Sequence, residues 1–190
     1  MTTASGGQTN AAKRVRATVL PHAADLFAER GPAATSMRDI ADRSEVNAGL
    51  IFRHIGTKEA VVASVLEYLA DDLASARDAH ASREVIEARA ERSWRVIARA
   101  LLDGFDVARL QQRFPNIDQL LADARDQHDD DYAARVATAD AIALQLGWRL
   151  FGPFLRAATG LDEQTVGLIP APATGVISAH LGDPRGLRHD

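Results

Sequence analysis

Cysteine is absent from the 190 residues of this sequence, which excludes disulfides, thiolate zinc sites and cysteine nucleophiles. Aromatic residues make up only 5% of the chain, and runs of Val, Ile, Thr and Tyr are scarce. Ala, Leu, Arg, Glu and Asp are abundant instead. Because the abundant residues favour helices and the scarce ones favour strands, the composition predicts an all-α protein.

Long apolar runs are missing as well. No stretch approaches the ~20 apolar residues that span a bilayer, so no membrane partner is expected. The first ten residues, MTTASGGQTN, are small and polar and lack the basic and apolar segments of a secretory signal. We therefore expect a cytoplasmic location.

The chain is mildly acidic, with a formal net charge of −4, which argues against indiscriminate nucleic-acid binding. The charge is unevenly distributed, because residues 1–60 carry eight basic and six acidic side chains. This modest positive excess coincides with the segment EVNAGLIFRHIGTKEAVV, residues 45–62. A contact with a polyanion is therefore expected in this part of the chain.

Apolar residues recur at three- and four-residue steps from Val15 to Phe27, which predicts a helix after a disordered tail over residues 1–12. This helix is expected to end at Gly31. Pro21 interrupts the pattern. Either Thr18 caps the helix, so that Pro21 lies in its first turn, or the helix is kinked at Pro21, and we favour the first interpretation.

The next segment predicts two short helices joined by a tight turn. Ser36 and Asp39 resemble a capping box that opens the first, and Asn47 caps the second, which runs to about His54. Thr57 then begins a long helix that ends near residue 80. Two short helices joined in this way form a helix-turn-helix, whose second helix enters the major groove of DNA with its N-terminus first.

The second short helix has the residues that DNA contact requires. Its cap, Asn47, leaves backbone N–H groups free toward phosphate, and Gly49 permits close approach. Arg53, His54 and Lys58 can neutralise the phosphate backbone. We therefore predict a DNA-binding head over residues 13–58.

Single residues of this helix have structural alternatives. Ile51 and Phe52 are better explained as core than as contacts. Arg53 and His54 are better explained as DNA contacts than as solvated charges. Leu50 could equally pack in the core or touch a thymine methyl group.

Residues 59–182 are expected to form a larger helical domain, followed by a loose tail over residues 183–190. Its predicted helices cover Val85 to about Asp103, residues 105–113, residues 117–124, residues 132–160 and, more weakly, residues 161–182. Gly152 and Pro153 predict a break or bend in the helix over residues 132–160.

Apolar residues of this domain form two candidate sets. One could line a pocket for a small lipophilic ligand, although ordinary core explains any single member better: Trp94, Leu101, Phe105, Leu110, Phe114, Tyr132 and Leu144. The other is dense enough to exceed what a monomer can hide and predicts a dimer interface in a four-helix arrangement: Trp148, Phe151, Phe154 and Leu155.

The acidic stretch DARDQHDDDYAAR, residues 123–135, could hold a divalent metal through its carboxylates and His128. Acidic residues at the start of a helix are also what the helix dipole favours, and we prefer this explanation. Ser93, His80 and Asp78 are scattered at ordinary helical positions. Neither an enzyme nor a cofactor is therefore expected.

The run TSMRDIADRSEVNAGLIFRHIGTKEAVVASVLE, preceded by AADLFAERGPAA, resembles the DNA-binding domain of the tetracycline-repressor (TetR) family of bacterial regulators. The likeness covers about residues 14–66 and includes Ile40, Ala41, Val46, Gly49, an aromatic residue at 52, His54, Lys58 and Glu59. It implies a homodimeric repressor that reads a palindromic operator and is released by a small effector. Alternatives are a regulator whose C-terminal domain only dimerises and a scaffold that has lost DNA binding.

The resemblance also implies roles for single residues. It places Thr35, Ser36, His54 and Lys58 at phosphates, and Asn47, Ala48, Leu50 and Arg53 at base edges. Four positions depart from the family's pattern: Glu45 replaces the usual glycine of the turn, Ala48 a basic residue, Leu50 a Thr or Ser, and Phe52 a Tyr. Glu45 is expected to strain or reshape the turn and to bring a carboxylate near DNA.

Overall fold

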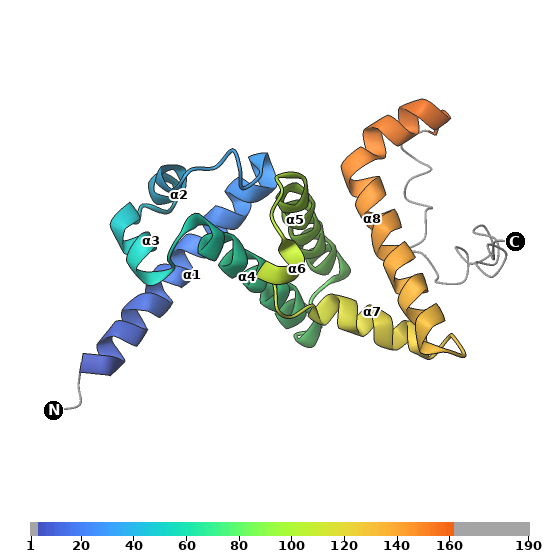
Figure 1. Ribbon diagram of the computed structural model, residues 1–190, viewed down its shortest axis with the longest axis horizontal. Helices are drawn as coiled ribbons and strands as arrows, with labels where there is room; N and C mark the ends of the chain where they lie inside the picture. The colour runs from blue at the N-terminus through green and yellow to red at the C-terminus, as the bar shows by residue number, and fades with distance from the viewer. Residues whose placement is uncertain (1–3, 162–190) are drawn as a thin grey trace, which may run out of the picture. The chain divides into compact units, whose positions relative to one another are not determined.

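The computed structural model describes residues 4–161, which form eight α-helices and no strand (Figure 1). The prediction of an all-α protein is therefore confirmed for these residues. The helices are α1 (Ala4–Arg30), α2 (Met37–Ser44), α3 (Ala48–His54), α4 (Lys58–Asp78), α5 (Arg83–Leu102), α6 (Val107–Leu110), α7 (Pro115–Arg125) and α8 (Asp131–Thr159). Two compact units divide the chain between Phe114 and Pro115, so the first contains α1 to α6 and the second contains α7 and α8.

Helix α1 is longer than the sequence predicted. It begins at Ala4, so residues 4–12, predicted to be a disordered tail, are helical. Pro21 consequently lies in the helix interior, and the interpretation that Thr18 caps the helix is wrong. The Thr18 hydroxyl instead donates to the carbonyl of Arg14, 3.1 Å away. Because proline has no N–H, this interior position removes one helical hydrogen bond, which the packing of α1 must offset.

Caps define both ends of α2. Ser36 and Asp39 form the predicted capping box, in which the Ser36 hydroxyl accepts from Asp39 N–H and the Asp39 carboxylate accepts from Ser36 N–H. At the other end, the N–H groups of Glu45 and Val46 both donate to the carbonyl of Ala41. This is a Schellman-type ending, which requires a left-handed backbone at Glu45. The turn after α2 is therefore held by backbone hydrogen bonds.

One apolar core joins the helices of the first unit. Fully buried residues come from five helices and include Val19 and Phe27 of α1, Ile40 of α2, Ile51 of α3, Leu66 of α4 and Val96 of α5. Burial of a side chain of this size contributes about 1.5–3 kcal/mol. Since α3 is short and carries a core residue at its centre, packing of this residue determines which face of α3 remains exposed.

Helix α5 braces α1 at the turn that contains the proline. The Arg92 guanidinium donates to the carbonyl of Pro21 at 2.6 Å and pairs with the carboxylate of Asp25 at 2.7 Å. Both α4 and α5 pack against α1. The predicted domain boundary after residue 58 therefore does not divide the packing, which extends to Phe114.

Caps also account for the long helices. Thr57 caps α4 and Ser82 caps α5, so both helices lie within about two residues of their predicted bounds. Helix α6 is shorter than the predicted helix over residues 105–113. Pro115 opens α7, in agreement with the preference of proline for the first helical position, where its missing N–H has no partner to lose.

In the second unit, α7 packs against α8 through alanines. Ala124 of α7 and Ala134, Ala137 and Ala141 of α8 are buried, and such small side chains let two helices approach closely. Helix α8 runs without interruption through Pro153, so of the predicted break or bend only the break is contradicted. The helix predicted over residues 161–182 and the tail predicted over residues 183–190 lie outside the described residues, apart from residue 161.

Candidate DNA-binding interface

Helix α3 has one buried face and one exposed face. Ile51 is fully buried, whereas Ala48, Gly49 and Leu50 in the first turn are exposed. The side chain of Asn47 caps the helix by accepting from Gly49 N–H at 2.8 Å. A Cβ at position 49 would lie 3.0 Å from this capping oxygen, so glycine gives the cap the space it needs. The first turn of α3 is thus compact and open to a partner.

Phe52 lies on the exposed side of α3. Its exposed fraction is 63%, so the prediction that it belongs to the core is wrong, while the same prediction for Ile51 is confirmed. One residue of helix turns the side chain by ~100°, which takes Phe52 away from the face that Ile51 buries. Leu50 is 43% exposed and available for contact. Exposed apolar side chains grouped on one short helix mark a surface that contacts a partner.

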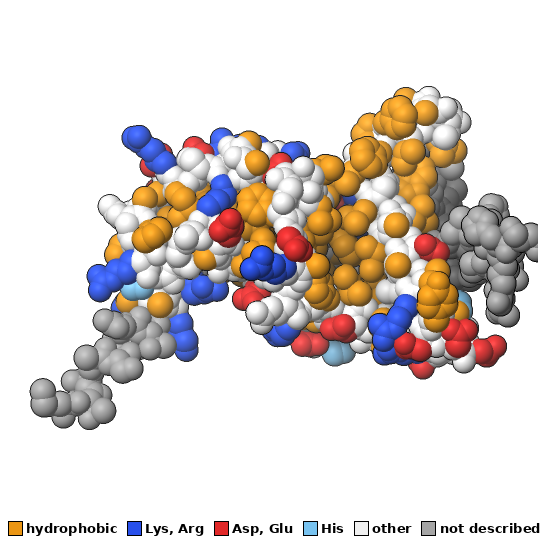
Figure 2. Space-filling view, viewed as in Figure 1, with side chains coloured by type: hydrophobic (Ala, Val, Ile, Leu, Met, Phe, Trp, Pro, Cys, Tyr) orange, Lys and Arg blue, Asp and Glu red, His pale blue; other side chains and the backbone are white. Residues whose placement is uncertain are grey.

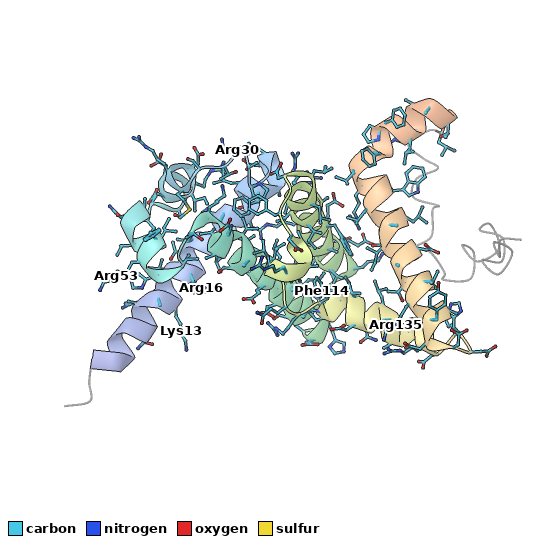
Figure 3. The ribbon with its side chains drawn as sticks, viewed as in Figure 1. Lys13, Arg16, Arg30, Arg53, Phe114 and Arg135 are labelled. Atoms are coloured by element: carbon cyan, nitrogen blue, oxygen red, sulfur yellow. The ribbon has the colours of Figure 1, made fainter. Side chains whose placement is uncertain are left out.

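Arg53 supplies the positive charge of α3, and His54 follows it. Arg53 is exposed and forms no hydrogen bond or ion pair with the described residues, whereas His54 is half-buried. Figure 3 places Arg53 at the same end of the first unit as Lys13 and Arg16 of α1, with Arg30 at the other end of that helix. Figure 2 shows Lys and Arg side chains around the end formed by α1, α2 and α3. This end of the unit suits an anionic partner.

Lys58 is turned toward the protein. Its Nζ donates to the carbonyl oxygens of Pro32, at 2.6 Å, and Thr35, and lies 5.6 Å from the centroid of the Phe27 ring. Burial lowers the pKa of the Lys58 ammonium, while the carboxylates of Asp39 and Asp103 oppose this shift. Lys58 therefore holds the turn between α1 and α2, and the phosphate contact expected for it stays a prediction.

Thr35 and Ser36 also serve this turn. Thr35 is 1% exposed, and its hydroxyl donates to the carbonyl of Gly31 at 2.8 Å. Its side chain is thus buried and its hydroxyl engaged, and the phosphate contact expected for it stays a prediction. Ser36 is exposed, but its hydroxyl is engaged twice with Asp39 in the capping box. Both side chains thus fix the backbone just before α2.

Asp103, at the end of α5, is a residue of this region that the sequence did not indicate. Its Oδ2 accepts a hydrogen bond of 2.7 Å from the N–H of Ala33. A Cβ at Gly31 would lie 2.6 Å from the same oxygen, and Gly31 has a positive φ of 84°. The close contact with Asp103 and the backbone conformation therefore both favour glycine at this position. The turn between α1 and α2 is therefore held by Lys58 and by Asp103.

The residues predicted to line a ligand pocket are not brought together within one unit. Five of them lie in the first unit and Tyr132 and Leu144 in the second. Phe105 and Leu110 are partly buried against the core of the first unit, in agreement with the alternative explanation that they are core. Leu101 is 50% exposed and Tyr132 71% exposed. Trp94 and Phe114 are half-buried.

The residues predicted to form a dimer interface all lie on α8. Phe151 is 52% exposed and Phe154 is 68% exposed, while Trp148 and Leu155 are half-buried. Among the described residues, this helix therefore carries large apolar side chains that its own unit does not cover.

The acidic stretch over residues 123–135 performs structural tasks. The carboxylate of Asp130 caps α8 by accepting from Ala133 N–H. Asp131 pairs with Arg125 at 2.7 Å and with Arg135 at 2.6 Å. Arg135 and Arg125 hold the pKa of Asp131 below its usual value through these hydrogen bonds.

None of the helices in the described part of the chain is long and apolar enough to cross a bilayer.

Comparison with known proteins adds to this geometry. The model of the family described as bacterial regulatory proteins, tetR family, matches residues 19–65, which contain α2, α3 and parts of α1 and α4. The HTH-type transcriptional repressor Rv3405c of Mycobacterium tuberculosis is 56% identical over 153 residues, or 80% of this chain and 81% of the relative. The HTH-type transcriptional regulator Mb3439c of Mycobacterium bovis has the same identity and coverage.

A more distant similarity covers a shorter segment. The HTH-type transcriptional repressor KstR2 of Rhodococcus jostii is 45% identical over 58 residues, which are 30% of this chain and 28% of the relative. The first two relatives thus resemble most of the chain, whereas the third resembles less than a third of it.

Proposed function

The chain belongs to the TetR family of bacterial regulatory proteins, and on this premise we propose that it is a homodimeric repressor that binds a palindromic operator. It is a transcriptional regulator of the TetR type. The proposal adds the form of its DNA site, the dimer and the release from DNA by a small lipophilic effector. DNA binding is assigned to the head over residues 13–58, and the remaining helices to dimerisation and effector binding.

The exposed face of α3 carries the proposal. Its first turn offers Ala48, Gly49 and Leu50 to a groove, and Arg53 follows one turn later with a guanidinium that no described residue engages. The major groove is about 12 Å wide and admits one helix. In this arrangement Arg53 can donate two hydrogen bonds to a guanine, and Leu50 can contact a thymine methyl group. His54, at the end of α3, and Ser36, just before α2, would contact the phosphate backbone of the DNA.

A dimer is supported by the apolar residues of α8. Phe151 and Phe154 would be covered if the same helix of a second copy packed against them, and a two-fold axis would bring the two heads to equivalent half-sites. A palindromic operator mirrors this symmetry. Sedimentation of the full-length wild-type protein and of the Phe154→Glu variant measures the oligomeric state of each. We expect a wild-type dimer that the variant weakens, and a monomeric wild-type protein would contradict the proposed dimer.

Release by an effector follows from a population shift. A ligand lowers operator affinity only by as much as it prefers the conformation that does not fit the operator. Apolar residues such as Trp94 and Phe114 suit a lipophilic ligand. A thermal-shift screen with small lipophilic compounds, followed by operator binding with each hit, tests this step. If no compound both binds and releases DNA, the alternative of a regulator that only dimerises is favoured.

The first experiment is the selection of bound duplexes from a random DNA library by the purified full-length protein at moderate salt. We expect enrichment of an inverted repeat, because two identical α3 helices read two identical half-sites. Enrichment of a single, unrepeated site would contradict the palindrome and the dimer. No enrichment by a folded, dimeric protein would contradict sequence-specific DNA binding.

A further inference from the structure

Glu45, in the turn between α2 and α3, has an unusual backbone. Its φ of 54° and ψ of 28° lie in the left-handed region, and among the described residues only His80 is another non-glycine residue with a positive φ. The Schellman ending of α2 creates this requirement, and glycine meets it without steric conflict. A glutamate there carries a conformational cost, so the side chain is a candidate for a role outside the turn.

The carboxylate of Glu45 has no partner in the described chain. The residue is exposed and forms no side-chain hydrogen bond or ion pair with the described residues. It lines a surface hollow beside the start of α3, together with Arg38, Asp42, Asn47 and Ala48. No ion pair among described residues joins Arg38 to either carboxylate. The hollow therefore has one positive and two negative side chains next to the residues proposed to read bases.

A carboxylate in this place has two opposite effects on DNA binding. Phosphates repel it, so it weakens binding to every sequence. At a base edge in the major groove, a carboxylate accepts from the N4 amino group of cytosine. Adenine also offers an amino group, but its neighbouring N7 is an acceptor that repels a carboxylate. Cytosine is therefore the base that best offsets the repulsion.

We propose that Glu45 is a specificity-determining residue of operator recognition, which accepts from a cytosine amino group at the edge of each half-site and disfavours other DNA. The proposal rests on the proposed function, because it presumes that α3 enters the major groove. Glu45 follows α2 and precedes the Asn47 cap by two residues, so it lies at the end of α3 that enters the groove first. Asp42, in the same hollow, adds to the repulsion of other sequences.

The test compares wild type with Glu45→Gln, which keeps the size of the side chain and removes its charge. Binding of the full-length protein to the selected operator and to random-sequence DNA is measured at several salt concentrations. We expect Glu45→Gln to bind random DNA about fivefold more tightly and the ratio of operator to random affinity to fall about tenfold. Glu84→Gln, which removes an exposed charge in the first turn of α5, is the matched control and should leave the ratio unchanged.

A second variant separates charge from backbone conformation. Glu45→Gly removes the carboxylate and the conformational cost together, so we expect a higher Tm and the same loss of specificity. Replacement of the predicted cytosine in the operator should weaken wild type about tenfold and Glu45→Gln little. An unchanged affinity ratio in Glu45→Gln, or a change in Glu45→Gly alone, would overturn the proposal. Failure of wild type to select any site would instead contradict the proposed function, so the two failures are distinguishable.

Discussion

Asp103 Oδ2 accepts a hydrogen bond of 2.7 Å from the N–H of Ala33, which joins the end of α5 to the turn before α2 across 70 residues of sequence. This turn also receives the ammonium group of Lys58. Two side chains from other helices thus hydrogen-bond backbone groups of the turn, namely the N–H of Ala33 and the carbonyls of Pro32 and Thr35. The position of α2, and through it that of α3, depends on both contacts.

Asp103→Ala should lower the free energy of unfolding by about 1 kcal/mol, because the N–H of Ala33 loses its acceptor at an exposed site where water partly replaces it. Urea denaturation of the purified protein measures this change. Asp103→Asn keeps an acceptor oxygen of the same shape and should retain most of the stability. Equal stability of wild type and Asp103→Ala would show that the hydrogen bond does not hold the turn.

Lys58 should give a pH dependence of stability in alkaline solution. Burial holds its folded-state pKa below the ordinary 10.5, so between these two values the unfolded chain binds more protons than the folded one. Stability contributed by this group therefore rises as pH increases through that window. The quantity to follow is the difference in free energy of unfolding between wild type and Lys58→Met, measured from pH 8 to pH 11.

A control for the Lys58 experiment is Lys13→Met, which removes an exposed lysine of α1 and should follow wild type across the pH range. Lys58→Met should also lose about 1–3 kcal/mol at neutral pH, because the carbonyls of Pro32 and Thr35 lose a charged donor. Parallel pH curves for wild type and Lys58→Met would contradict the buried position of the ammonium group.

Ile51 and Phe52 are neighbours on α3 with opposite environments, so their truncation should have opposite consequences. Ile51→Ala should lose about 2–5 kcal/mol of stability, since it leaves a cavity in the core. Phe52→Ala should change stability by less than about 0.5 kcal/mol but weaken operator binding, because the ring is exposed. Urea denaturation and operator titration separate the two effects, and similar stability losses would place Phe52 in the core after all.

Arg53→Ala should weaken binding to the selected operator by about 1–3 kcal/mol and binding to random DNA by much less, if the guanidinium reads a base. The control is Arg83→Ala, which removes an exposed arginine of α5 paired with Glu87. Titration of labelled duplexes gives both affinities. Equal losses on operator and random DNA would reduce Arg53 to a phosphate contact.

Much of the helical framework could be predicted from sequence, because caps and apolar periodicity are local signals. Thr57 begins α4 where predicted, and the capping box of Ser36 and Asp39 is present. The start of α1 could not be predicted, since Pro21 suggested a boundary. Packing against α5 and the contacts of Arg92 support a proline inside α1, and no local signal reports contacts across 71 residues.

The candidate site was predicted less completely than the fold, and its errors share a cause. The resemblance implied phosphate contacts for Lys58 and Thr35 but did not indicate that both side chains donate to carbonyls of the turn between α1 and α2. Phe52 was placed in the core because large aromatic residues are usually buried. In each case the partner is set by tertiary structure. Only the position of α3 and the exposed state of Arg53 follow from periodicity.

The contacts of α5 with the head have a consequence for protein synthesis and engineering. A ribosome that has released residues 19–65 has released every residue of the matched family segment but neither Arg92 nor Asp103. The contacts of Arg92 with Pro21 and of Asp103 with Ala33 can form only after the end of α5 has been synthesised. A chimaera that exchanges heads between relatives at residue 65 would separate the turn of one parent from the aspartate of the other, whereas a junction at Phe114 would transfer both together.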